Sequence, residues 1–174
     1  MKIQEFIIYI SYEPIRSVCF LTQSDESKHW VLIFKSEDVC LRLDADNGVD
    51  AKVESHYGEF DFSRYKNKEI FVIAHFSGYV CDVDMAVNEI EHSINGTRYC
   101  VEYNNCQHYV ARVLVYLESH ATATGRTLLF NIDVFNKDTC KYLKTMEVLA
   151  RCDIKHGSKN EFQNKRNVKI AKVV

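Results

Sequence analysis

The first residue whose position suggests chemistry is Cys106, in the stretch EYNNCQHYVARVLVYLESH (102–120). Apolar residues at helical spacing after it predict an amphipathic helix: Tyr109, Val110, Val113, Leu114 and Leu117. Asn104 and Asn105 stand where an N-cap belongs, so Cys106 falls in the first turn. Unpaired backbone N–H groups and the helix dipole favour a thiolate there. The pattern suits a nucleophile, although most cysteines simply pack as small apolar side chains.

A cysteine nucleophile needs a general base, usually a histidine held by a third polar group. His108 follows Cys106 by two positions, so a helix turns the two side chains to nearly opposite sides and His108 is expected to be structural. Four other histidines, at positions 56, 75, 92 and 120, are expected to be hydrated or hydrogen-bonded at the surface. Among the histidines of residues 1–150, His29 is the remaining candidate for the base.

His29 opens the stretch HWVLIFKSEDVCLRLD (29–44), which reads as two strands joined at a short turn, Ser36–Glu37. A symmetric turn pairs residues whose numbers sum to 73. This register gives one apolar face, in which Trp30, Leu32 and Phe34 oppose Leu43, Leu41 and Val39. It also places His29 opposite Asp44, whose carboxylate would fix the imidazole tautomer. The alternative is a surface pair without chemistry.

The elements that must position these residues follow a simple order along the chain. Six β-rich runs come first: 3–10, 17–22, 29–35, 38–44, 51–57 and 69–76. Helical patterns follow, with one helix capped by Asp82 and reaching Ile94, the Cys106 helix, and a helix over 138–149; a late strand is expected over 128–135. Strands followed by helices predict an α+β fold, an antiparallel β-sheet packed by helices.

Composition predicts one globular domain over residues 1–150 and a basic C-terminal tail over 151–174. The tail has seven Lys/Arg and two Asp/Glu, against fifteen and twenty-two in the rest of the chain, and is expected to be loosely ordered. The seven cysteines include no CxxC pair, which predicts no metal site and no disulfide framework. Without an apolar run long enough for a secretory signal or transmembrane segment, the expected location is cytoplasmic.

Two patches of the sequence resemble the lecithin:retinol acyltransferase family, within the NlpC-type class of permuted papain-like folds. KHWVLIF (28–34) is similar to the family strand that begins His-Trp and carries the base, and NCQHYV (105–110) is similar to the segment that carries the nucleophilic cysteine. Tyr99 stands seven residues before Cys106, as a tyrosine does in the family. The resemblance covers residues 29 to about 117 and implies a permuted papain-like fold.

The chain departs from the family pattern at three points. The second family histidine would fall near Leu41, so Asp44 would have to replace it. Gln107 stands where the family has glutamate, and a basic tail stands where many members have a membrane helix. The resemblance places Tyr99 and Gln107 in the oxyanion or substrate-binding region.

These patterns predict a thiol hydrolase or acyltransferase that attacks an amide, ester or thioester through Cys106, His29 and Asp44, forming an acyl-enzyme without a cofactor. Its partner would be an acyl, peptide or ubiquitin-like substrate. One alternative is a pseudoenzyme that keeps the scaffold as an interaction module. Another is binding of nucleic acid or an anionic membrane surface through the basic charges of the tail.

Overall fold

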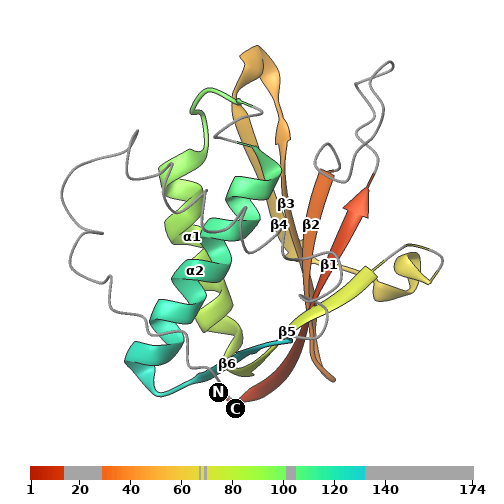
Figure 1. Cartoon of the computed structure of the whole chain (residues 1–174), viewed down its shortest axis with the longest axis vertical. Helices are drawn as coiled ribbons and strands as arrows, with labels where there is room; N and C mark the ends of the chain where they lie inside the picture. Colours follow the sequence, from red (N-terminus) through yellow and green to blue (C-terminus); the bar gives the residue numbers. More distant parts are fainter. Residues whose placement is uncertain (14–28, 67, 69, 101–104, 132–174) are drawn as a thin grey trace.

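The computed structural model describes residues 1–13, 29–66, 68, 70–100 and 105–131. In this part of the chain, six strands form one antiparallel sheet in the order β4-β3-β2-β1-β5-β6. The strands are β1 (Gln4–Glu13), β2 (His29–Lys35), β3 (Cys40–Asn47), β4 (Val53–Glu59), β5 (Ile70–Gly78) and β6 (Thr127–Phe130). The helices α1 (Val80–Ile94) and α2 (Cys106–Thr124) pack on one face of the sheet (Figure 1). The predicted α+β class is confirmed at this level.

The main core lies between the sheet and the two helices. Alternate residues of the central strands point into it, including Ile8 and Ile10 of β1 and Leu32 and Phe34 of β2. From α2 it takes apolar residues of the predicted stripe: Tyr109, Val110, Val113, Leu114 and Leu117. Burial of this face fixes how α2 sits on the sheet.

A smaller apolar cluster covers the opposite face of the sheet. Its buried members are Val31, Ile33 and Tyr65, and Tyr65 comes from the short 3-10 helix η3 (Phe62–Tyr65). This small apolar cluster therefore covers part of the face, beside the polar residues of β3.

The hairpin register differs from the predicted one. Leu32 pairs with Leu43 and Lys35 with Cys40, so paired numbers sum to 75 rather than 73. The turn contains four residues, Ser36 to Val39, and is closed by a 2.8 Å hydrogen bond from the Ser36 N–H to the Val39 carbonyl. The error is two positions, so the predicted apolar face stays on one side of the sheet.

Other predicted elements were adjusted or lie outside the described residues. Asp82 is not the N-cap of α1: Tyr79 holds that position, and the Asp82 carboxylate accepts a 2.7 Å hydrogen bond from the Tyr79 N–H. β6 begins one residue before the predicted late strand and ends at Phe130. The predicted strand 17–22, helix 138–149 and tail 151–174 lie outside the described residues. None of the described helices is long and apolar enough to cross a membrane.

Candidate active site

Cys106 is the first residue of α2, as predicted. Asn105 is the N-cap, and its Oδ1 accepts hydrogen bonds from the backbone N–H groups of Gln107 (2.9 Å) and His108 (3.2 Å). The Cys106 side chain faces the core between sheet and helices and is only 3% exposed. The cap therefore fixes the thiol at the positive end of the helix.

His108 is buried beside this cap. Its Nδ1 contacts Asn105 Oδ1 at 2.8 Å, which makes Nδ1 the protonated nitrogen because the amide oxygen only accepts. His108 thus supports the residue that caps the Cys106 helix, in agreement with the predicted structural role.

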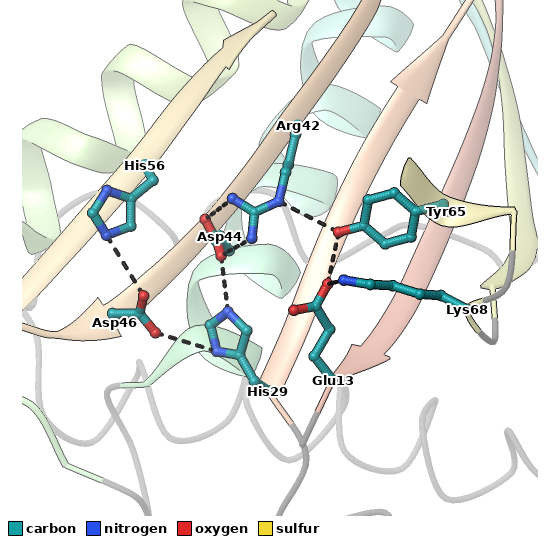
Figure 2. A network of polar contacts seen from close by, with 8 residues as sticks. All are labelled: Glu13, His29, Arg42, Asp44, Asp46, His56, Tyr65 and Lys68. Atoms are coloured by element: carbon teal, nitrogen blue, oxygen red, sulfur yellow. Dashed lines mark hydrogen bonds and ion pairs between the residues drawn. The ribbon is translucent and has the colours of Figure 1, made fainter. Parts of the chain in front are cut away.

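His29 and Asp44 meet where β2 and β3 cease to pair. Their paired register ends at Leu32–Leu43, although β2 begins at His29 and β3 continues to Asn47. His29 Nε2 lies 2.9 Å from Asp44 Oδ2 (Figure 2). The predicted contact is present, but it is diagonal rather than directly cross-strand, because the shifted register would set His29 against Asp46.

His29 also contacts the nucleophile candidate. Burial would lower the pKa of His29, but hydrogen bonds to Asp44 and Cys106, with the negative charges of Cys106 and Asp46, raise it to about 10. At neutral pH the imidazole is therefore protonated, which is the state that stabilises a neighbouring thiolate.

Tyr99 lies against Cys106, whereas the backbone of Gln107 is engaged elsewhere. Burial and the charge of Cys106 raise the pKa of Tyr99, while a hydrogen bond from the Cys106 N–H acts in the opposite direction. The Tyr99 N–H donates to the Ala51 carbonyl at 2.7 Å, which ties the residue to the β3–β4 connection. Since the Gln107 N–H binds Asn105, the Cys106 N–H and the Tyr99 hydroxyl are the better-placed pair for an oxyanion.

Asp46 lies beside His29 on the exposed side, and His56 lies beside Asp46. Asp46 Oδ1 lies 3.5 Å from His29 Nδ1, and Asp46 Oδ2 lies 3.6 Å from His56 Nε2. His29, Asp44 and Asp46 offer ligand atoms within 4.8 Å of one another, close enough for a metal ion. However, Arg42 donates to both oxygens of Asp44, so a cation would have to compete with a guanidinium already bound there.

The contact of Arg42 with Asp44 is the part of this site that the sequence did not predict. Arg42 Nη2 lies 2.6 Å from Asp44 Oδ2 and Arg42 Nη1 3.1 Å from Asp44 Oδ1. The i, i+2 spacing of Arg42 and Asp44 on one strand face was the available signal. Tyr65, Glu13 and Lys68, which continue this network, come from distant segments and left no pattern in the sequence.

Comparison with models of known protein families, with curated proteins and with solved structures found no match.

Proposed function

We propose that the protein is a thiol hydrolase or acyltransferase with a permuted papain-like arrangement, in which Cys106 is the nucleophile, His29 the acid and base, and Asp44 the orienter. The observations that carry this proposal are the 2.9 Å contact of His29 Nε2 with Asp44 Oδ2 and the effect of Cys106 on the pKa of His29, which is raised by a thiol beside the imidazole. A thiol at a helix N-terminus beside a protonated imidazole is the arrangement that cysteine hydrolases use. The order of histidine strand before cysteine helix supports the permuted form.

In the first half-reaction, the Cys106 thiolate attacks the carbonyl carbon of an amide, ester or thioester. The carbonyl π electrons move to oxygen, where the Cys106 N–H and the Tyr99 hydroxyl stabilise the negative charge. Collapse of this intermediate breaks the bond to the leaving group, which takes the proton of imidazolium His29. An acyl-thioester on Cys106 and a neutral His29 remain.

In the second half-reaction, neutral His29 takes a proton from water, an alcohol or an amine as its oxygen or nitrogen attacks the thioester. Expulsion of Cys106 as thiolate restores the ion pair with His29. Asp44 holds the imidazole through Nε2 during both steps, which keeps the orientation of the ring fixed. The acceptor decides between hydrolysis and acyl transfer.

The test is site-resolved alkylation with iodoacetamide at neutral pH, read by peptide mass spectrometry. Cys106 should react faster than Cys40, Cys81 and Cys100, although those three are more exposed. His29→Ala should remove this advantage, while His75→Ala, which changes a histidine on β5, should not. Labelling of another thiol first, with Cys106 inert in the folded protein, would exclude Cys106 as the nucleophile.

A pseudoenzyme is the second candidate, and one observation favours it. Cys106 is nearly closed off from solvent, and the first three N–H groups of its helix are engaged by Tyr99 or Asn105. A substrate would have to displace the Tyr99 contact to reach the Cys106 N–H. Tyr99→Phe separates the two candidates. In an inactive scaffold, Cys106 of this variant would label no faster than Cys106 of the wild type. In an enzyme, Cys106 of the variant would still label, but the variant would turn its substrate over poorly.

A further inference from the structure

Asp44 is held from two sides. Only 1% of it is exposed, and its carboxylate contacts His29 on one side and the Arg42 guanidinium on the other (Figure 2). The two cations share one oxygen, Oδ2, while Arg42 also binds Oδ1. We propose that Arg42 is a positioning residue that fixes Asp44 and sets the ionisation of the Cys106–His29 pair. This inference rests on the proposed function.

Arg42 is itself held by residues from other parts of the sheet. Its Nε contacts the Tyr65 hydroxyl at 3.4 Å, Tyr65 donates to Glu13 Oε1 at 2.7 Å, and Lys68 Nζ lies 2.8 Å from the same oxygen. Burial would raise the pKa of Glu13, but the hydrogen bonds from Lys68 and Tyr65 lower it, so Glu13 is an anion at neutral pH. We call Glu13, Arg42, Tyr65 and Lys68 the Arg42 network.

The Arg42 network joins the site as a series of charges of alternating sign. Lys68 is positive, Glu13 negative, Arg42 positive, Asp44 negative and imidazolium His29 positive. In the proposed function, the Cys106 thiolate adds the next negative charge. Tyr65 stands between Glu13 and Arg42 as a neutral hydroxyl, since burial and Glu13 raise its pKa to about 12. The Arg42 network comes from β1, β3, η3 and the segment between η3 and β5, and it reaches His29 of β2 through Asp44. The contacts therefore tie the site to the central strands of the sheet.

Arg42 matters because the charge of His29 changes during the proposed reaction. When His29 passes its proton to the leaving group, Asp44 loses the cation on that side while remaining buried. A buried carboxylate without a partner is strongly unfavourable and would pull the proton back. Arg42, which stays protonated at all working pH values, compensates Asp44 in both states of His29 and so lets His29 release its proton.

The sign of the effect follows from the groups around His29. Asp44 and Asp46 of β3, Cys106 of α2 and Glu13, its cross-strand partner on β1, are acidic groups near it. Arg42 binds Asp44, Lys68 binds Glu13 and His56 contacts Asp46. Removing Arg42 takes away a positive charge, which favours protonated forms of both Cys106 and His29. The pH–reactivity profile of Cys106 should have two limbs, one reporting the titration of Cys106 and one that of His29. Both limbs should therefore move to higher pH.

The experiment measures the rate of Cys106 alkylation by iodoacetamide across pH in the wild type and four variants. In Arg42→Gln, both limbs should move up by about one pH unit, as Coulomb's law gives at the dielectric of partly buried pairs. The plateau rate of alkylation should fall about tenfold or more, because Asp44 loses its orientation. In Arg42→Lys, which keeps the charge but not the two-pronged contact, the limbs should stay and only the plateau should fall. Tyr65→Phe should move the limbs less, in the same direction, and serves if Arg42→Gln does not fold.

Arg64→Gln is the matched control. Arg64 stacks over the Phe60 ring at 5.7 Å, as Arg42 does at 5.9 Å, but its side chain is exposed and outside the Arg42 network. Its limbs should match the wild type. The inference is overturned if Arg42→Gln lowers only the plateau, if its limbs move down, or if Arg64→Gln moves them equally. If wild-type Cys106 does not label at all, the proposed function fails and the inference falls with it; normal wild-type labelling with an unaltered Arg42→Gln profile sinks the inference alone.

Discussion

Replacement of Asp44 by asparagine tests the centre of the site by its effect on stability. The carboxylate is almost fully buried and accepts three contacts, at 2.6 and 3.1 Å from Arg42 and 2.9 Å from His29. Asparagine is nearly isosteric but neutral, and its NH2 group would face a donor on either Arg42 or His29. Removing one partner of a buried ion pair costs about 3–5 kcal/mol. Since the partners of Asp44 are partly hydrated, we expect the free energy of unfolding to fall by roughly 2–4 kcal/mol.

The pH dependence of this loss identifies its source. The pKa of His29 is about 10 in the folded protein against 6.5 when unperturbed, so protonated His29 contributes stability that is complete below pH 6.5 and is lost as pH rises toward 10. Burial has the largest effect on this pKa and lowers it. The hydrogen bond to Asp44 has the next largest effect and raises it. In Asp44→Asn the decline of stability between pH 6.5 and 10 should therefore be shallower than in the wild type.

Urea denaturation followed by circular dichroism at several pH values in this range provides the measurement. The difference in unfolding free energy between wild type and Asp44→Asn should be largest near pH 6.5 and should shrink toward pH 10. Asp38→Asn is a suitable control, because Asp38 is an exposed carboxylate whose partners are Lys2 and Gln4. A constant difference across the range would show that Asp44 does not stabilise the His29 cation, and the orienter assignment would fail.

Three smaller changes address the elements around Cys106. His108→Ala should lower the free energy of unfolding by about 1–2 kcal/mol, because the buried bond from Nδ1 to Asn105 is lost, and it should leave Cys106 reactive; loss of labelling with an unchanged melting temperature would contradict this. Asn105→Ala, measured by urea denaturation, should cost roughly 1–2 kcal/mol as the cap of α2 disappears. Ala51→Gly should raise the melting temperature, with a gain of about 1 kcal/mol, because Ala51 has a φ of 55° in the left-handed region, which favours glycine; an unchanged or lower melting temperature would show that no strain is stored there.

The helix that carries Cys106 could be predicted because all its signals are local. The asparagine cap and the apolar stripe lie within one continuous stretch. Gly125, which the prediction did not use, ends α2 with a left-handed φ of 69°. The separation of His108 from Cys106 follows from helix geometry alone. Such features need no knowledge of how distant segments meet.

The Arg42 network could not be predicted, because it depends on the order of strands. β1 lies between β2 and β5, and this places Glu13 beside His29, while Tyr65 and Lys68 reach the same face from the segment before β5. These residues are up to 55 positions apart in the sequence. Polar residues at such separations look like ordinary surface positions until the sheet brings them together.

The His29–Asp44 contact was predicted from a register that proved wrong, and the reason it survived lies in the geometry of strands. Two extra turn residues moved the pairing by two, which keeps every side chain on its original face, whereas a shift of one would have turned Asp44 toward the helices. The β2–β3 pairing then ends at Leu32–Leu43, so the register between these two strands does not set the separation of His29 and Asp44. Each of the two still pairs with its other neighbour, His29 with β1 and Asp44 with β4. Arg42, on the same face as Asp44, draws the carboxylate to a position that His29 also reaches. Alternation of side chains along β3 therefore explains why His29 and Asp44 lie on the same face of the sheet. The end of β2–β3 pairing and the contact with Arg42 explain why they lie within hydrogen-bonding distance.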